Sequence, residues 1–154
     1  MIKLVAFDLD GTLVNSLEDL ADSANHALKD LGYPEHDVNE YRYFVGSGVD
    51  KLFERALPSE HNDAQTVKKA RAVFETYYNR SYCNKTVPYV SVKELLKALE
   101  ERHYKIAVLS NKPDTFARHI LDTLFPDFQF DYVLGASDDL PKKPAPDGLL
   151  NCLE

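Results

Sequence analysis

The chain has 154 residues, of which 44% are hydrophobic and 28% are charged, as in ordinary globular domains and unlike disordered or membrane proteins. Its formal charge of −7, from 18 basic and 25 acidic residues, repels nucleic acid and anionic lipid, so neither partner is expected. No apolar run reaches the roughly 18 residues of a membrane-spanning helix. Asp8 interrupts the N-terminal apolar run where a signal peptide would continue, so we expect a cytoplasmic protein.

The first half of the chain predicts one short strand followed by a block of helices. Ile2–Phe7 is an apolar, β-rich run that stops abruptly at Asp8, as a buried strand does when it ends in a loop. An amphipathic helix is expected at 17–31, closed by a glycine. A second helix is expected at 49–57. A third, polar helix follows and ends near Asn84, and its buried stripe is expected to be Val67, Ala70, Phe74 and Tyr77 or Tyr78.

After Val87 the pattern changes to helices that alternate with strands. Apolar residues recur at helical spacing in 92–99 and 116–124, whereas 105–110 and 132–135 are short β-rich runs. Such alternation is typical of a parallel sheet with crossover helices.

The predicted fold class is therefore α/β. We expect a three-layer, Rossmann-like core with a parallel sheet, formed by residues 1–14 and 84–154, and an inserted α-helical domain at 15–83. Two cysteines, Cys83 and Cys152, are too few for a disulfide framework and are expected to be packing residues.

Two carboxylates, Asp8 and Asp10, follow the first predicted strand. Ligands of open parallel sheets bind beyond the carboxyl ends of the strands, and Gly11 lets backbone N–H groups approach a bound oxyanion. Two such acids repel each other unless a cation lies between them, and their oxygens favour Mg²⁺. An acid-rich turn is the alternative, but the preceding strand and the following Gly-Thr pair favour a chemical role.

Polar groups also follow the second and third core strands. Ser110 and Asn111 could donate to phosphate oxygens, although a polar loop that caps the next helix explains them equally well. Lys143 lies in the proline-rich segment 142–146, from which an ammonium could neutralise a phosphoryl group near Asp8. A solvated basic loop is the alternative for this segment.

These three elements, in this order, resemble the motifs of the haloacid dehalogenase-like superfamily of phosphotransferases over essentially the whole chain. They stand here as Phe7-Asp8-Leu9-Asp10-Gly11-Thr12-Leu13, Leu109-Ser110-Asn111-Lys112 and Lys143-Pro144-Ala145-Pro146. A helical cap inserted after the first motif is the arrangement of the phosphoglycolate phosphatase-like branch, which the segments 45–48 and 110–112 also resemble.

The resemblance implies a Mg²⁺-dependent phosphatase for a small phosphorylated metabolite, with 2-phosphoglycolate the first substrate to try. Asp8 would attack phosphorus and form an aspartyl-phosphate, and Asp10 would act as general acid and base. Mg²⁺ would be bound by the Asp8 carboxylate and the Asp10 carbonyl. Ser110, Asn111 and Lys143 would bind the transferring phosphoryl group.

The cap would close over the site, with Gly46 and Gly48 on the substrate side, although a helix-start turn explains these glycines nearly as well. Two other functions stay open. One is a sugar-phosphate mutase of the same superfamily, which retains the phosphoryl group on a bound intermediate. The other is a non-catalytic fragment that pairs with a partner. A dehalogenase is not expected, because that branch does not need an acid at the Asp10 position.

One family motif has no counterpart in the chain. In the family, a strand ending in Gly-Asp follows the third motif, completes the Mg²⁺ site and lies beside the first strand, whereas Asp138 and Asp139 precede Lys143 and are expected to be loop acids. We therefore expect C-terminal core strands to be missing and the strand 2–7 to be an open edge. The rest of the protein would be present as a separate piece, or the chain would be a truncation with weak or no activity.

Overall fold

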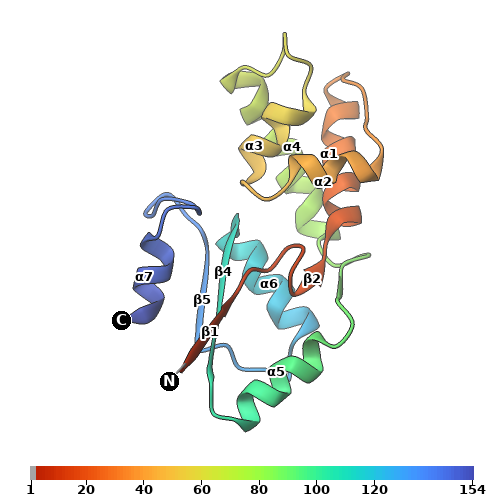
Figure 1. The fold of residues 1–154 in the computed structure, drawn as a ribbon. Coiled ribbons are helices and arrows are strands. Elements are labelled where there is room, and N and C mark those ends of the chain that lie inside the picture. The colour runs from red at the N-terminus through yellow and green to blue at the C-terminus, as the bar shows by residue number, and fades with distance from the viewer. Residues whose placement is uncertain (1–2) are drawn as a thin grey trace. The chain divides into compact units, whose positions relative to one another are not determined.

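A three-stranded parallel sheet forms the framework of the computed structural model, which describes residues 3–154 (Figure 1). Its strands are β1 (Leu4–Phe7), β4 (Lys105–Pro113) and β5 (Tyr132–Ala136), in the order β1-β4-β5. The residues 106–109 of the central strand are all buried, as expected for a strand that is covered on both faces. The predicted first strand includes Ile2, which lies outside the described residues.

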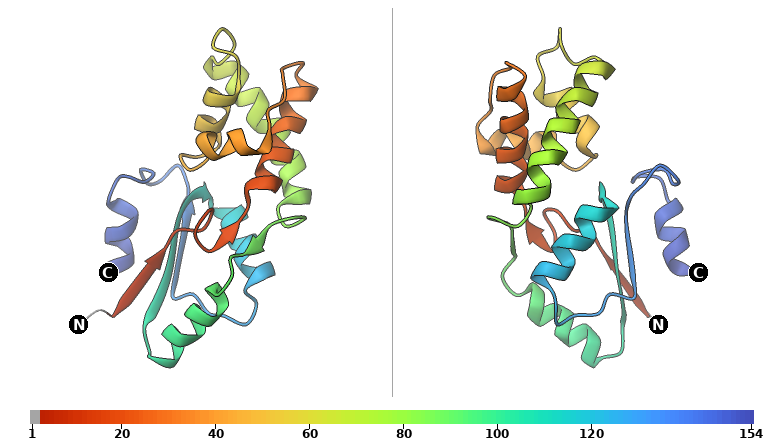
Figure 2. Two further views of the ribbon diagram at one scale, coloured as in Figure 1. Left: turned by 45° about the vertical axis from the view of Figure 1, so that its right-hand side comes forward. Right: turned by 180° about the vertical axis from the view of Figure 1, so that it is seen from behind.

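Helices cover both faces of this sheet. Helix α5 (Val92–Glu101) precedes β4, and α6 (Asp114–Leu124) connects β4 to β5. These two helices lie on one face, whereas α7 (Asp147–Leu153) lies on the other (Figures 1 and 2). Right-handed crossovers that progress in one direction along a sheet place their helices on the same face. The three-layer α/β fold predicted from the sequence is confirmed.

Strand β1 lies at one edge of the sheet that the described residues form. It pairs with β4 in parallel from Leu4↔Lys105 to Phe7↔Val108, and β4 pairs with β5 on its other side. The open edge that the sequence predicts for the first strand is therefore present in this part of the chain.

A short antiparallel pair lies beside the main sheet, and the sequence does not predict it. Strand β2 (Val14–Asn15) pairs with β3 (Val87–Pro88), so that Asn15 lies opposite Val87. Strands this short carry no periodicity that a sequence pattern could reveal.

Contacts divide the chain into two units. The core unit comprises Met1–Asn15 with Val87–Glu154, and the helical unit is Ser16–Thr86. The helical unit contains α1 (Leu17–Asp30), the 3₁₀ helix η1 (Val38–Glu40), α2 (Tyr41–Phe44), α3 (Val49–Ala56) and α4 (Ala64–Ser81).

The helical unit is organised around α1 and α4, which pack against each other. On α4, Phe74 and Tyr78 are buried with their ring centroids 5.1 Å apart, so Tyr78 rather than Tyr77 takes the inward position. The short helix α2, which the sequence does not predict, is anchored by Tyr41. Burial raises the pKa of Tyr41, whose hydroxyl donates to Asn25 Oδ1 at 2.6 Å.

Two local predictions in the core unit are wrong. The strand predicted at 105–110 continues to Pro113, because Pro113 pairs with Ala136 of β5. The apolar spacing in 92–99 places Val92, Leu95, Leu96 and Leu99 on one helix face, but Leu95 is 46% exposed. Its neighbour Leu96 takes the buried position instead, and adjacent residues of a helix point about 100° apart.

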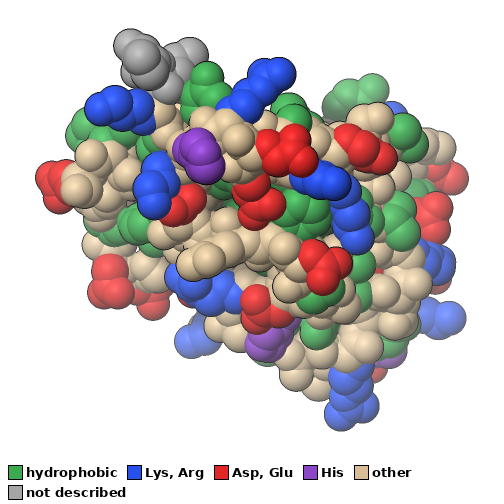
Figure 3. All heavy atoms as spheres, turned by 90° about the horizontal axis from the view of Figure 1, so that it is seen from below, with side chains coloured by type: hydrophobic (Ala, Val, Ile, Leu, Met, Phe, Trp, Pro, Cys, Tyr) green, Lys and Arg blue, Asp and Glu red, His purple; other side chains and the backbone are tan. Residues whose placement is uncertain are grey.

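Acidic and basic side chains are interspersed on the face of the molecule that Figure 3 shows.

Cys83 and Cys152 are free thiols, and both are partly buried. Within residues 3–154 we find no helix with the length and apolar character needed to cross a membrane.

Candidate active site at the carboxyl edge of the sheet

The two predicted carboxylates lie directly after β1, on either side of a buried leucine. The carbonyl of Leu9 accepts hydrogen bonds of 3.0–3.2 Å from the N–H groups of residues 12–14, which closes a tight turn. Leu9 is buried, whereas the side chains of Asp8 and Asp10 on either side of it are 44% and 21% exposed.

Lys143 reaches Asp8 from the segment that follows β5. Its Nζ lies 3.0 Å from Asp8 Oδ1 and donates a hydrogen bond of 2.7 Å to the carbonyl of Leu109. The Lys143 side chain is 39% exposed, so its ammonium can also meet a solute. The fold thus brings the first and third sequence motifs together, because the carboxyl ends of parallel strands share one edge of the sheet.

Asn111 holds the backbone of Lys143. Its Nδ2 donates to the Lys143 carbonyl at 3.0 Å, and its Oδ1 accepts from the Lys143 N–H at 2.8 Å. Ser110 is buried beside it in β4, and its hydroxyl accepts a hydrogen bond of 3.1 Å from the Lys112 N–H. The structure gives Asn111 a part in positioning Lys143. The phosphate-binding roles of Ser110 and Asn111 stay predictions.

Lys112 is the site residue to which the sequence assigns no role. Its Nζ donates to both oxygens of Asp10, at 3.1 Å to Oδ1 and 3.2 Å to Oδ2, and its side chain is only 3% exposed. Lys112 belongs to the second motif, and its position after Ser110 and Asn111 is the one sequence feature that indicates a functional role for it. Each of the two carboxylates is therefore paired with one lysine.

The junction of β4 and α6, next to Lys112, leaves no room for a side chain at position 135. A Cβ on Gly135 would lie 2.3 Å from Asp114 Cα and 2.8 Å from the Lys112 carbonyl oxygen. The Gly135 N–H donates to Asp114 Oδ1 at 2.8 Å, and Arg118 Nε lies 2.7 Å from the other oxygen of Asp114. Close backbone contact therefore fixes the segment that carries Lys112.

The oxygen donors at this edge fit Mg²⁺. In proteins Mg²⁺ is usually bound by one or two carboxylates, and water and substrate phosphate complete its shell. The Asp8 carboxylate and the Asp10 carbonyl are donors of this kind. Between Lys3 and Glu154 the structure brings no three Asp, Glu, His or Cys side chains together as a metal cluster. The described residues thus offer oxygen donors for only part of the shell that such an ion needs, and magnesium binding stays a prediction.

The predicted substrate-side residues, Gly46 and Gly48, lie in the helical unit between α2 and α3. Their φ angles are 111° and 94°, and Gly48 is the N-cap residue of α3. Glycine adopts such angles without steric cost, so the turn that begins α3 accounts for both residues. Their contact with a substrate stays a prediction.

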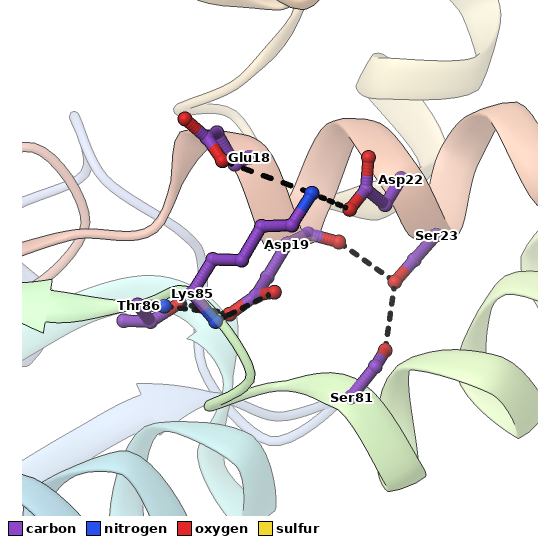
Figure 4. A network of polar contacts seen from close by, with 7 residues as sticks. All are labelled: Glu18, Asp19, Asp22, Ser23, Ser81, Lys85 and Thr86. Carbon is purple, nitrogen blue, oxygen red and sulfur yellow. Dashed lines mark hydrogen bonds and ion pairs between the residues drawn. The ribbon is translucent and has the colours of Figure 1, made fainter.

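A second polar cluster, which the sequence does not reveal, lies within the helical unit (Figure 4). Asp19 is 1% exposed, and its Oδ2 accepts hydrogen bonds from the N–H groups of Lys85 and Thr86 at 2.9 and 2.8 Å. The Thr86 hydroxyl donates to the same oxygen at 2.7 Å. Nearby, the hydroxyls of Ser23 and Ser81 lie 3.2 Å apart. The sequence indicates Asp19 only as an acid of a first helical turn, because its partners lie far along the chain.

The fold and the site together define a class. The chain is an α/β protein with a helical insertion after its first strand and an aspartate–lysine site at the carboxyl edge of a parallel sheet. The sequence pattern of the haloacid dehalogenase-like hydrolases matches residues 5–154. The chain belongs to this family, as its three motifs predict.

Within the family, the chain is similar to bacterial phosphoglycolate phosphatases. It is 35% identical over 150 residues to that of Aliivibrio fischeri, covering 94% of this chain and 66% of that protein. It is 33% identical over 153 residues to that of Aquifex aeolicus, covering 99% and 70%. The crystal structure of a predicted phosphoglycolate phosphatase from Haemophilus somnus matches with a TM-score of 0.89 and 37% identity, covering 97% of this chain and 69% of that one. The chain spans about two thirds of the length of the curated relatives it matches.

Proposed function

We propose that the protein is a Mg²⁺-dependent phosphatase that hydrolyses a small phosphomonoester, with 2-phosphoglycolate as the first candidate substrate. One observation carries the proposal: at the carboxyl edge of the sheet, Asp8 faces the ammonium of Lys143 and Asp10 faces that of Lys112. Attack on an anionic phosphoryl group requires a nucleophile beside fixed positive charge. Membership of a hydrolase family and similarity to phosphoglycolate phosphatases support the substrate class.

Asp8 is the proposed nucleophile. Its Oδ1 lies 2.8 Å from the Leu9 N–H and 3.0 Å from Lys143 Nζ, and these contacts orient the carboxylate. The other oxygen, Oδ2, attacks phosphorus in line with the ester oxygen. A bond from Oδ2 to phosphorus forms while the bond to the leaving oxygen breaks, which gives an aspartyl-phosphate.

Asp10 is the proposed general acid and base. It donates a proton to the leaving oxygen in the first step and takes a proton from the attacking water in the second. That water attacks phosphorus, releases inorganic phosphate and restores the Asp8 carboxylate. Lys143, with Ser110 and Asn111 beside it, binds the phosphoryl oxygens as negative charge shifts among them.

The proposed metal ligands are the Asp8 carboxylate and the Asp10 carbonyl. When bound, Mg²⁺ supplies positive charge that offsets the repulsion between the nucleophilic carboxylate and the anionic substrate. In the helical unit, Gly46 and Gly48 are the residues proposed for the substrate side.

Incubation of the purified protein with Mg²⁺ and a panel of phosphomonoesters tests this proposal. We expect release of inorganic phosphate, together with a transient mass gain of one phosphoryl group that maps to Asp8. Both signals should disappear in Asp8→Asn and persist in the matched control Asp138→Asn, which changes an exposed acid after β5. If no ester on the panel gives phosphate or the adduct, the proposal is wrong. Isomerisation of a sugar phosphate without phosphate release would instead identify a mutase.

The edge position of β1 favours a second proposal, which concerns a partner. Apolar strand edges are templates for pairing with a further strand, and β1 lies at the edge of the described sheet. We propose that it pairs with a segment equivalent to the third of the relatives' length that this chain does not span. Native mass spectrometry with that segment of the Aliivibrio fischeri protein should give a one-to-one complex. A scrambled segment is the control, and equal binding of both would contradict the proposal.

A further inference from the structure

The two lysines of the site differ in their surroundings. The side chain of Lys143 is 39% exposed and that of Lys112 is 3% exposed. Lys143 can therefore meet a phosphoryl group that arrives from solvent. The ammonium of Lys112 is instead directed at the Asp10 carboxylate, with almost equal distances of 3.1 and 3.2 Å to its two oxygens.

Packing alone does not account for Lys112. Burial of an ammonium carries a desolvation cost of several kcal/mol, which a single ion pair only partly offsets. An apolar side chain of similar length would fill the same space in β4 without that cost. The retained charge therefore points to an effect of Lys112 on Asp10.

The contact restrains the Asp10 carboxylate from one side. A carboxylate offers about four lone-pair positions on its two oxygens. An ammonium that bonds to both oxygens uses one position on each and fixes the plane of the group. Lys112 belongs to β4, so its ammonium reaches the Asp10 carboxylate from a residue of the central strand.

We infer that Lys112 is a positioning residue for Asp10, an inference that rests on the proposed phosphatase function. It holds the Asp10 carboxylate in one orientation, so that the same group meets the leaving oxygen in the first step and the water in the second. The two lysines thus have different roles: Lys143 lies beside Asp8 and binds the phosphoryl group, and Lys112 orients Asp10, which transfers protons. Proton transfer needs this fixed geometry, since a misplacement of about 1 Å can cost about 100-fold in rate.

A comparison of two substrates separates positioning from a structural role. The variant is Lys112→Met, which removes the charge and keeps the length of the side chain. With 2-phosphoglycolate, whose leaving group needs a proton, we expect kcat to fall about 10- to 100-fold with little change in KM. With p-nitrophenyl phosphate, whose leaving group departs without a proton, the burst of the first step should change much less. Lys112→Arg should recover part of the lost rate, and Lys142→Met, next to Lys143, is the matched control.

Two outcomes of the kinetic test would overturn the inference. One is an equal loss in the rate of the first step, measured by the burst, on both substrates, which a general structural defect would produce. The other is an unchanged kcat in Lys112→Met. Thermal unfolding of each variant confirms that the rates compared belong to folded protein.

Carbon-13 NMR gives a readout that does not depend on turnover. In protein labelled at the aspartate carboxyl carbons, the Asp10 resonance is assigned with Asp10→Asn and the Asp8 resonance with Asp8→Asn. Lys112→Met should shift the Asp10 resonance and move that of Asp8 much less. If the wild type is active but Lys112→Met leaves the Asp10 resonance unmoved, only the positioning role of Lys112 is wrong. If the wild type shows no turnover, the proposed phosphatase function is wrong. The two failures are therefore distinguishable.

Discussion

Asp19 in the helical unit and Asp10 in the core unit are both hydrogen-bonded aspartates, but their partners differ in kind. Asp19 accepts hydrogen bonds from two backbone N–H groups, those of Lys85 and Thr86, and from the Thr86 hydroxyl. Asp10 faces the ammonium of Lys112, at the end of a long side chain.

This difference matches a structural role for Asp19 and the proton-transfer role that we propose for Asp10. Backbone donors are neutral and are fixed by the path of the chain, so a carboxylate held by them cannot change partners without local unfolding. A carboxylate beside a lysine has a neighbouring positive charge, which offsets repulsion when an anion approaches. The two aspartates thus differ in the kind of partner as well as in exposure, which is 1% for Asp19 and 21% for the Asp10 side chain.

Asp10→Asn should give the largest effect and tests the reactive side of the comparison. The amide cannot give or take the proton, so we expect phosphate release to slow by about 10²- to 10⁴-fold. The amide oxygen of the variant can still accept a hydrogen bond from Lys112, so the protein should remain folded by circular dichroism. Asp139→Asn, another exposed acid of the core unit, is the control. A rate within about tenfold of the wild type would contradict the assignment of Asp10 as acid and base.

Lys143→Met should follow, with a loss of about 10²- to 10³-fold in kcat/KM. The variant removes the exposed ammonium beside Asp8, and removal of one donor that stabilises developing charge typically costs this much. Steady-state kinetics with the best ester of the panel measures the loss. Lys142→Met removes the adjacent charge and should leave the rate almost unchanged, and equal losses in the two variants would point to a general field effect instead.

Asp19→Ala tests the structural side of the comparison. Two buried N–H groups and a hydroxyl lose their acceptor, so the free energy of unfolding should fall by about 2–4 kcal/mol. Urea denaturation measures the change, and kcat of the folded variant should stay near the wild-type value. The control is Asp22→Ala. Asp22 lies on the same helix and pairs with the Lys85 side chain in solvent, so its loss should change the free energy of unfolding little. Similar losses of stability in both variants would contradict the structural role assigned to the buried Asp19.

Asp131→Asn should give the smallest effect and shows how an exposed acid behaves. The Lys105 ammonium and the Ile106 N–H hydrogen-bond to Asp131 and hold its pKa below the ordinary 3.8. The carboxylate therefore stabilises the fold at neutral pH, and this contribution is lost as the pH falls below 3.8 and through the lowered pKa.

We expect Asp131→Asn to lower stability at pH 7 by less than about 1 kcal/mol, with a difference that disappears in acid. Denaturation curves across this pH range measure it. Asp127→Asn, an exposed acid in the same loop, is the control. A stability difference that grows toward low pH would have the wrong sign for a lowered pKa.

Much of the core could be predicted because its signals are local. The apolar run of β1 stops at Asp8, and the β-rich run at 105–110 predicts the strand that the structure shows as β4. Parallel strands end at one edge, so the motifs after β1, β4 and β5 were expected to meet there, and Lys143 does lie at Asp8. The chemical roles of these residues stay predictions.

What the sequence missed depends on partners that are distant along the chain. The extension of β4 to Pro113 requires Ala136 of β5, and the pairing of Lys112 requires Asp10. In the sequence, Asp19 resembles any solvated acid in the first turn of a helix. Its partner Thr86 is distant along the chain and comes close only in the fold. No local pattern encodes such contacts, because they form only when the fold closes.

The antiparallel pair of β2 and β3 makes the helical unit a replaceable module. Asn15 lies opposite Val87, and directly opposed residues of an antiparallel pair are only about 5 Å apart at their Cα atoms. The helical unit therefore leaves and rejoins the core through adjacent ends, a gap that a tight turn of about two residues can bridge. Excision of 16–86 with such a turn in its place would yield a minimal core, and helical units of other lengths could be grafted onto the same two strands.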